Sequence, residues 1–414
     1  MRSATLDRTF QSLRVPNYRR FFIGQVFNWT GTWVQWMAQG WLVLQLTDSG
    51  FGLGLVTALQ WSPILVFGAW AGVIADRFDK RKLLIVTNVT GAALSLILGL
   101  VTVAGVVQLW MVVGIALMLG LVTALDNPTR QTFTLEMVGR DRLTNAVSLN
   151  TMTFTTARVA GPAIAGLLIS WVGIGPCFLL NVASFVPITV ALFMMRTDEL
   201  DQGMPVERSR GQVREGLRYV ATVPVLKTLL IVMAVVGTLQ YNFQVILPLL
   251  AKDTFNGGAA TFGFLGAAIG VGMFAGSLTS AAFGRPTRKV LLLAGSSLGV
   301  FTLLVAAAPN LWAAALLLMP LGASSMAFLA TMNSTLQLTT SDQMRGRVMA
   351  IYFVLFLGST PIGAPIVGWV AETFSPQAAF ALGGVATLAA CAYAYLKLPH
   401  AQIGASESPE MAVG

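Results

Sequence analysis

The stretch Gly72-Val-Ile-Ala-Asp-Arg-Phe-Asp-Lys-Arg-Lys82 is a dense cluster of charge in a chain of which only 10% is charged. It separates two long apolar stretches, about residues 51–71 and 83–106, that carry almost no ionisable side chains. Each stretch is long enough to cross a bilayer, because a transmembrane helix needs roughly 20 apolar residues. A short loop with four cations and two carboxylates between two such spans is therefore predicted to lie at a membrane surface.

The composition of the whole chain also indicates a membrane protein. The 414 residues are 55% hydrophobic and their mean hydropathy is +0.73, whereas a soluble protein carries roughly 25% charged residues. The apolar runs are continuous, which excludes a transmembrane barrel, because barrel strands alternate in short segments. We predict an all-α membrane protein with twelve transmembrane helices in two six-helix, pseudo-symmetric halves. The expected spans are 19–46, 52–76, 83–106, 109–128, 146–171, 174–196, 226–251, 260–283, 289–308, 310–338, 347–371 and 376–397.

Positive charge is distributed asymmetrically between the predicted loops. All Lys and Arg residues except Lys252 and Arg158 fall in or beside the two tails and the loops after spans 2, 4, 6, 8 and 10. Cytoplasmic loops carry such an excess of Lys and Arg. We therefore expect a multi-pass protein of the inner (cytoplasmic) membrane with both termini in the cytoplasm. The net charge of +9 then reflects topology and not nucleic-acid binding.

Side chains typical of enzyme sites are scarce. Cys177 and Cys391 both fall inside apolar spans and are expected to be core residues. The single histidine, His400, lies in the polar tail, which leaves no histidine for a proton relay or a metal site. No Ser-His-Asp, Cys-His or phosphate-binding Gly-Lys-Ser/Thr motif occurs. The sequence therefore predicts no enzyme, no cofactor and no metal.

The widest polar gap, about residues 196–225, divides the chain into two sets of six spans. Within it Val213, Leu217 and Val220 recur at helical spacing between arginines, which predicts a short amphipathic helix on the inner leaflet. A solvated linker is the alternative. The expected organisation is an N-terminal half 1–196, a cytoplasmic linker 197–224 with this helix, a C-terminal half 225–397 and a cytoplasmic tail 398–414.

The two halves repeat one another in sequence. Asn127-Pro-Thr-Arg-Gln131 matches Asn333-Ser-Thr-Leu-Gln337, and Gly161-Pro-Ala-Ile-Ala-Gly166 matches Gly363-Ala-Pro-Ile-Val-Gly368. The opening cluster has a weakened counterpart, Gly284-Arg-Pro-Thr-Arg-Lys289, which lacks the acid. Parallel six-span repeats with a substrate site near the midplane between them are one architecture of secondary transporters.

These motifs carry a family resemblance. The pattern G-x-x-x-D-R-x-x-K-R-K from Gly72 resembles the loop signature of the major facilitator superfamily. Residues 126–133, 143–149 and 158–166 resemble its branch of enterobactin-type siderophore exporters and macrolide efflux proteins. The resemblance implies a monomeric exporter of an amphipathic small molecule that works by alternating access, with protons as the coupling ion. Such motifs specify fold better than cargo.

The resemblance also assigns a role to the first loop. It implies that an Asp and an Arg here lock the halves together while the cytoplasmic side is closed, and that an Asp and an Arg at the end of span 4 join them. Asp79 stands where the family usually has Gly. The alternative is that the cations only set topology. The expected gate residues are Gly72, Asp76, Arg77, Lys80, Arg81, Asp126 and Arg130.

Asp126 and Arg130 are four residues apart at the predicted cytoplasmic end of span 4. Pro128 should interrupt regular helix between them, so an ion pair is not assured. Asp126 is the one carboxylate that falls clearly within a predicted span. If protons drive transport, it is the expected titrating group; a structural ion pair is the alternative.

Arg158 lies about 18 Å into span 5 at 1.5 Å per residue, close to the bilayer centre. An Arg at that depth costs about 2.5–3.5 kcal/mol unless it faces water or a partner. Thr151, Thr155 and Arg158 recur at helical spacing, so we expect this stripe to face a hydrated cavity. There Arg158 would attract an anionic or polar part of the cargo, and bonding to helix carbonyls is the alternative.

Spans 1 and 7 carry neutral amides and aromatic rings, which suit an amphipathic cargo. The expected cavity residues are Asn28, Thr32, Trp33, Gln35, Trp36, Gln39, Thr155, Arg158, Tyr241, Asn242 and Gln244.

The segment Gly161-Pro162 to Gly166 resembles the span-5 signature of drug and proton antiporters, with Ala165 in place of one glycine. Small residues let helices approach closely, so tight packing without directional meaning is the alternative to an export signature. Two other functions remain open. One is uptake or facilitated diffusion of a metabolite, and the other is a membrane sensor on the same fold that transports nothing.

Overall fold

The computed structural model describes residues 10–200, 212–282 and 287–398. Every regular element within these residues is helical, so the predicted all-α fold class is confirmed. The chain divides into two compact units, Met1–Glu207 with Leu247–Ala267, and Arg208–Ile246 with Ala268–Gly414. Residues 247–267, which the sequence places in the C-terminal half, thus pack with the first unit.

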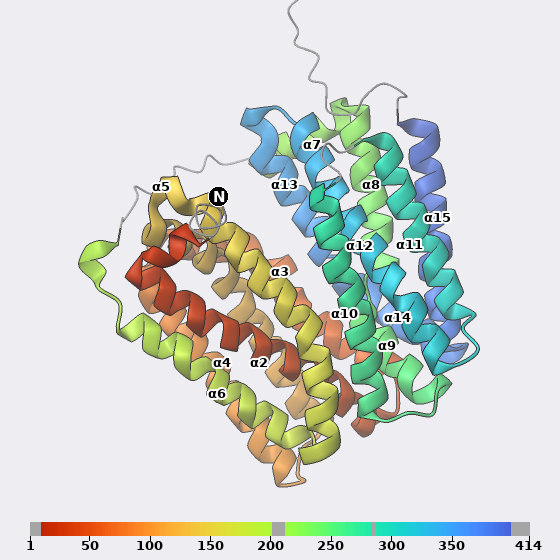
Figure 1. Cartoon of the computed structure of the whole chain (residues 1–414), viewed down its shortest axis with the longest axis horizontal. Helices are drawn as coiled ribbons and strands as arrows, with labels where there is room; N and C mark the ends of the chain where they lie inside the picture. The colour runs from red at the N-terminus through yellow and green to blue at the C-terminus, as the bar shows by residue number, and fades with distance from the viewer. Residues whose placement is uncertain (1–9, 201–211, 283–286, 399–414) are drawn as a thin grey trace, which may run out of the picture. The chain divides into compact units, whose positions relative to one another are not determined.

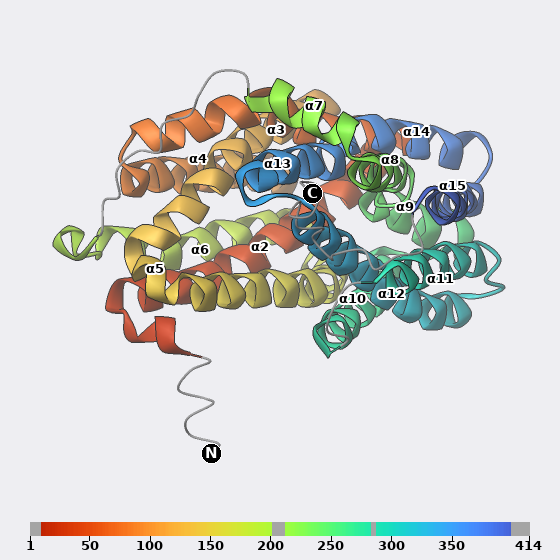
Figure 2. The same cartoon turned by 90° about the horizontal axis from the view of Figure 1, so that it is seen from above.

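The first unit is built from five long helices (Figure 1). Within it α2 packs against α5 and α6, and α4 packs against α5 and α6 (Figure 2). Polar side chains cap the N-termini of two of these helices. Ser49 accepts a hydrogen bond from Gly52 N at the start of α3, and Asp79 accepts one from Lys82 N at the start of α4. Such caps satisfy backbone N–H groups that a helix start leaves without partners. The helices are α2 (Pro16–Thr47), α3 (Gly50–Arg77), α4 (Lys80–Val103), α5 (Leu109–Val172) and α6 (Ile174–Phe193).

α5 contains two predicted spans, and Gly139 separates them with φ 71 and ψ 175. Its first arm continues about ten residues beyond the predicted end at residue 128, and Pro128 lies inside the helix. The expectation that Pro128 interrupts the helix is therefore wrong. A proline removes one backbone hydrogen bond, and neighbouring hydroxyls can bind carbonyls near such a site. Here Thr129 Oγ1 donates to Leu125 O at 2.7 Å and Thr132 Oγ1 donates to Pro128 O at 3.0 Å.

Large side chains close the end of the first unit at which α2 begins. Tyr18, Phe21, Phe133 and Ile188 are completely buried in one cluster from α2, α5 and α6. Gly24 lets the backbones approach here, because a Cβ on it would lie 2.5 Å from the Cα of Ile188. This packing fixes α2 against the helices that carry the polar residues described below.

Two predicted spans of the C-terminal half are each divided into two helices in the structure. The predicted span 226–251 consists of α8 and α9 with a π-helical turn at Leu250–Thr254, and the span 347–371 consists of α13 and α14. Within the second unit, α11 packs against α12 and α15, as α4 packs against α5 and α6 in the first. Two helices, α9 (Phe243–Leu249) and α10 (Ala259–Ala282), belong partly to each unit. The other helices of the second unit are α7 (Gln212–Thr222), α8 (Pro224–Leu239), α11 (Arg288–Ala306), α12 (Leu311–Thr339), α13 (Asp342–Leu357), α14 (Thr360–Thr373) and α15 (Pro376–Lys397).

Ten helical segments among the described residues are long and apolar enough to cross a membrane. One of them is the 64-residue α5, which holds two predicted spans. α2 is 32 residues long but is not among the ten, because its amide and hydroxyl side chains lower its hydropathy. The chain is thus a multi-pass membrane protein, and the count of twelve spans stays a prediction.

Candidate functional site

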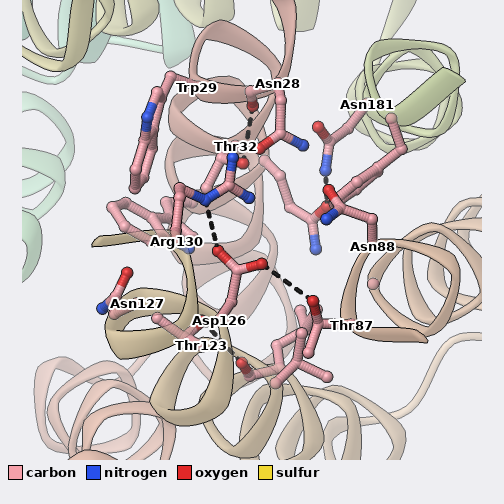
Figure 3. A pocket seen from close by; sticks show the side chains of 16 residues that line it. Asn28, Trp29, Thr32, Thr87, Asn88, Thr123, Asp126, Asn127, Arg130 and Asn181 are labelled. Carbon is pink, nitrogen blue, oxygen red and sulfur yellow. Dashed lines mark hydrogen bonds and ion pairs between the residues drawn. The ribbon is translucent and has the colours of Figure 1, made fainter. Parts of the chain in front are cut away.

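A pocket with a cavity volume of about 70 Å³ lies inside the first unit, between α2, α4, α5 and α6 (Figure 3). Its wall combines amides, hydroxyls and aromatic rings with one carboxylate and one guanidinium. The lining residues are Asn28, Trp29, Thr32, Gln35, Trp36, Thr87, Asn88, Gly91, Leu119, Val122, Thr123, Asp126, Asn127, Arg130, Asn181 and Phe185.

Asp126 and Arg130 form an ion pair in this wall. Arg130 Nε donates to Asp126 Oδ2 at 2.7 Å, and Thr87 Oγ1 donates to Asp126 Oδ1 at 2.9 Å. The side chains of Arg130 and Asp126 are only 8% and 14% exposed. The guanidinium also lies 5.7 Å from the ring centroid of Phe21 and 5.8 Å from that of Trp29. Because the helix continues through Pro128, the pair lies well inside α5 and not at its end.

Three buried polar atoms of the pocket residues have no hydrogen-bond partner among the described residues. They are the donors Arg130 Nη1 and Asn28 Nδ2 and the acceptor Asn88 Oδ1. A buried polar group without a partner costs about 1–3 kcal/mol, so such groups are uncommon in native interiors. Their presence in one pocket indicates a place where a polar ligand can bind.

Gln35 belongs to a second polar group at the inner end of this pocket. Its Oε1 accepts from Ser95 Oγ at 2.6 Å and from Asn181 Nδ2. The three side chains come from α2, α4 and α6, so they connect these helices.

Arg158 lies beside the aromatic part of α2 but is not a lining residue of the pocket. Its guanidinium is 5.7 Å from the ring centroid of Trp33, and Trp33 packs edge-on against Trp36 at 5.0 Å. Trp33 also contacts Phe154, which in turn contacts Trp29 at 4.8 Å. These rings form an aromatic strip with Arg158 at one end and Arg130 at the other.

The other cavity residues expected in the first unit are not lining residues of the pocket. Gln39 Nε2 donates to Gln60 Oε1 at 3.0 Å, and Thr155 is half-buried on the second arm of α5. The expected cavity residues thus divide into two sets. Asn28, Thr32, Gln35 and Trp36 line the pocket, whereas Trp33, Gln39, Thr155 and Arg158 do not.

The expected cavity residues of the predicted span 7 belong to the second unit. Tyr241 Oη donates to Ser325 O at 3.0 Å, and Asn242 Nδ2 donates to Thr238 O at 2.7 Å. Gln244 is half-buried. Nearby, Gln240 Nε2 donates to Thr302 Oγ1 at 2.7 Å, and its Oε1 accepts from Thr387 Oγ1 at 3.4 Å. Gln240 therefore repeats, in the second unit, the bonding of Gln35.

The cations of the first loop bind groups at the ends of neighbouring helices. Lys80 Nζ pairs with Glu136 Oε1 at 2.7 Å. Arg81 donates from Nε to Leu192 O at 2.6 Å and from Nη2 to Phe193 O at 3.0 Å, at the end of α6 where a cation is favourable.

Three other members of the expected gate lie around these cations. Gly72 is buried and Arg77 is exposed, while the side chain of Asp76 lies outside the described residues. The contacts of Asp126 and Arg130 lie inside the bundle, with Thr87, Phe21 and Trp29. Their expected link to this loop stays a prediction.

The predicted span-5 motif packs against two other helices. A Cβ on Gly161 would lie 2.4 Å from Trp33 Cβ, and one on Gly166 would lie 2.6 Å from the Cα of Gly263 in α10. Pro162 contacts Gly266 at the same helix pair. Residues 247–267 also reach α2 through a stacked pair of rings, Trp41 and Phe262, and through the ion pair between Lys252 and Asp48.

Sequence reasoning missed several residues of the site. Thr87, Asn88 and Asn181 line the pocket, and Ser95 binds Gln35 and Asn181 beside it. Their only signal in the sequence was that they are polar residues within apolar spans. Glu136 was missed as the partner of Lys80. No group of three or more His, Cys, Asp or Glu side chains that could hold a metal occurs in the described part of the chain.

The fold and the pocket define a polytopic, all-α membrane protein with a buried ion pair inside one helical unit, which is the class of a transporter. A family model described as "Transmembrane secretion effector" matches residues 7–412. The chain belongs to this family, a branch of the major facilitator superfamily, and is a transporter and not an enzyme.

Known relatives match most of the chain at low identity. It is 24% identical to the staphyloferrin A transporter of Staphylococcus aureus, over 89% of this chain and 93% of that protein. It is 26% identical to the enterobactin exporter EntS of Shigella flexneri, over 90% of this chain and 89% of that protein. Macrolide efflux protein A of Streptococcus pyogenes is 24% identical over 60% of this chain and 62% of that protein.

Solved structures show the same fold. The nucleoside transporter NupG matches with a TM-score of 0.74 at 12% identity, over 92% of this chain and 100% of that one. A bacterial homologue of the iron transporter ferroportin in an inward-facing state matches with a TM-score of 0.71 at 12% identity, over 92% and 98%. The predicted major facilitator fold is therefore confirmed.

Proposed function

We propose that this chain is a secondary active exporter that moves an amphipathic small molecule by alternating access. Two of its relatives are named as an exporter of enterobactin and as a macrolide efflux protein, and the family is one of secretion effectors. We place the protein in the inner membrane as a monomer with both termini in the cytoplasm, as its charge distribution predicts.

One observation supports this function most directly. The first unit keeps a buried Asp126–Arg130 ion pair in a pocket that also offers the rings of Trp29 and Trp36. Polar and ionisable residues inside membrane segments are expensive and mark substrate or proton pathways. A scaffold without transport has no need of such a pocket, which argues against the sensor.

The coupling ion in this proposal is the proton, and Asp126 is the group that carries it. Asp126 is bound by a hydroxyl and a guanidinium, so a proton on its carboxylate would weaken the bond to Arg130 and free that side chain. Antiport follows if the protein cannot hold a proton on Asp126 and a cargo molecule at the same time.

Two sets of contacts would alternate during transport. The cytoplasmic set comprises Asp76 and Arg77 of the first loop, which we propose as a latch. The opposite set is the close approach of Gly166 to Gly263 together with the Asp48–Lys252 pair. The close contact of small residues allows tight closure, and Gly161, Pro162 and Gly166 would then seal the side away from the cytoplasm.

The test is flux in proteoliposomes with an imposed pH gradient. The expected result is gradient-driven movement of a macrolide or of a siderophore in the export direction, with loss of gradient dependence in Asp126→Asn. Accumulation in the uptake direction, or flux that ignores the gradient, would favour the uptake or facilitated-diffusion carrier. No flux of any cargo, with or without the gradient, would favour the sensor.

A further inference from the structure

The wall of the pocket in the first unit holds two buried N–H donors, Arg130 Nη1 and Asn28 Nδ2, that have no hydrogen-bond partner among the described residues. We propose that Arg130 and Asn28 form a carboxylate-binding subsite, at which an anionic group of the cargo replaces Asp126 on Arg130. The inference deepens the proposed function, on which it rests, by naming the class of cargo as an amphipathic anion.

The first argument is geometric. Arg130 is 6% exposed and Asn28 is 4% exposed, and Arg130 Nη1 and Asn28 Nδ2 have no hydrogen-bond partner among the described residues. Both residues line the pocket, and Figure 3 shows the guanidinium of Arg130 turned toward Asn28 and Thr32. Arg130 thus offers a charged N–H donor in the pocket wall, and Asn28 offers a second donor in the same wall. Arg binds carboxylate oxygens through strong, charge-assisted hydrogen bonds.

The second argument uses the internal repeat as a control. The bonding of Gln35 and Gln240, and the matching segments at Asn127 and Asn333, align the two halves. In this alignment Met332 takes the place of Asp126 and Leu336 that of Arg130, and both are completely buried. The fold therefore closes this space with apolar side chains in one half.

The alignment has an energetic consequence. Replacing a buried ion pair by well-packed apolar residues is often neutral or stabilising. Stability alone thus gives no reason to keep Asp126 and Arg130 in the first half. Met233, also fully buried, occupies the position of Asn28, so all three polar groups of the subsite are specific to the first half.

The third argument is charge. Arg130 places a permanent cation in the pocket wall, and the rings of Trp29 and Trp36 line the same pocket. An aromatic anion that takes Arg130 from Asp126 therefore meets both a guanidinium and aromatic rings, because opposite charges attract strongly at low dielectric constant.

Asp126 can give up Arg130 without losing every partner. Thr87 binds one carboxylate oxygen of Asp126 and Arg130 binds the other. When a cargo carboxylate takes Arg130, Asp126 keeps the hydroxyl of Thr87. The exchange breaks no covalent bond and replaces one charge-assisted hydrogen bond by another of the same kind.

The experiment measures binding of benzoate and of its neutral isostere benzamide to the full chain in nanodiscs by calorimetry. We expect wild type to bind benzoate at least about tenfold more tightly than benzamide. Asp126→Asn removes the competing negative charge and should tighten benzoate by about another tenfold, as expected for a unit charge a few ångströms away, and leave benzamide unchanged. A purely structural pair would not produce this gain.

The matched variant, Asp126→Met with Arg130→Leu, places the two apolar residues of the second half at the equivalent positions of the first half. It should fold with an unchanged melting temperature and lose the preference for benzoate. Glu199→Gln, in an exposed ion pair with Arg196, is the control and should bind as wild type does. Equal binding of benzoate and benzamide to wild type, or weaker benzoate binding to Asp126→Asn, would overturn the subsite.

The experiments distinguish failure of the subsite proposal from failure of the exporter proposal. Benzoate preference without flux of any cargo would refute the exporter and leave the subsite standing. Gradient-driven export of a neutral macrolide without benzoate preference would refute the subsite and leave the exporter standing.

Discussion

The first and second units use equivalent positions of one repeat in opposite ways. The first buries an ion pair, Asp126–Arg130, where the second buries Met332 and Leu336. The packing of α11 against α12 and α15 in the second unit repeats that of α4 against α5 and α6 in the first. The apolar version shows what the fold needs at this place, so the charged version is an addition to the fold. A repeat within one chain therefore separates structural residues from functional ones without any alignment of relatives.

The same comparison assigns a structural role to the buried glutamines. Gln35 and Gln240 each bind a hydroxyl from the third helix of the half and a polar side chain from the sixth. Because both halves keep this network, it belongs to the common scaffold. Gln35 also lines the pocket, so its expected contact with cargo stays a prediction beside its role in fastening α2 to α4 and α6.

The largest expected effect is a loss of folding stability when only one residue of the Asp126–Arg130 pair is replaced by its apolar counterpart. Arg130→Leu alone leaves Asp126 buried without its counter-ion and should destabilise the protein by about 3–5 kcal/mol. Adding Asp126→Met should restore the stability to near wild type, since the second unit folds with the same two residues. The measurement is thermal unfolding in detergent. If the double variant is as unstable as the single one, the two halves are not interchangeable here and the comparison fails.

The sequence predicted the helical fold class of the first unit. Long apolar runs determine helices, so the all-α fold class could be read directly from the sequence. The continuation of α5 through Pro128 could not, because it depends on how the helix packs against its neighbours. As a result, the depth of Asp126 and its pairing with Arg130 were both uncertain from sequence.

The sequence predicted only some of the residues that line the pocket. The stripe of amides on α2 is periodic, so Asn28, Thr32, Gln35 and Trp36 could be selected. Asn88 lies in its span beside Thr87, and Asn181 lies three residues before Ser184. Such small hydroxyl side chains are common in apolar helices, so they did not single out a pocket. The meaning of Asn88 and Asn181 comes only from the proximity of α4 and α6, which local sequence does not encode.

The second prediction compares two close helix contacts of α10. A Cβ on Gly272 would lie 1.9 Å from Met319 O within the second unit, and one on Gly263 would lie 2.5 Å from the Cα of Gly166 within the first. Gly272→Ala should destabilise the protein by about 1–3 kcal/mol, the usual cost of overpacking. Gly263→Ala should reduce export more than tenfold, because that contact is proposed to form in only one state of the cycle.

Unfolding and flux, measured side by side, decide this prediction. The control is Gly114→Ala, another helical glycine of the first unit, because nothing lies within 4 Å of a Cβ at that position. It should change neither the stability nor the rate of export. A Gly263→Ala protein with normal export would show that the contact is not part of the cycle.

The third prediction tests the networks that the units share. Gln35→Leu and Gln240→Leu each leave buried polar partners unsatisfied, which costs about 1–3 kcal/mol. Because the bonding repeats, the two variants should lose similar stability, measured by thermal unfolding. Export by each, corrected for folded protein, should stay within about threefold of wild type. A selective loss of transport in Gln35→Leu would return that residue to the cargo site.

The smallest effect is expected at another ion pair of the first unit, that of Asp48 with Lys252. Asp48 is 83% exposed, and exposed pairs contribute about 0–1 kcal/mol, in contrast to the buried pair of Asp126. Asp48 has a left-handed backbone with φ 50, which Asn also tolerates, so Asp48→Asn removes the charge without straining the turn. Its melting temperature should match wild type, while export should rise modestly at low salt if the pair closes one side of the transporter. The reversal of both charges, Asp48→Lys with Lys252→Asp, should return export to the wild-type rate. Unequal rates would show that Lys252, the one cation predicted outside the cytoplasmic loops and off the membrane spans, acts on something other than Asp48.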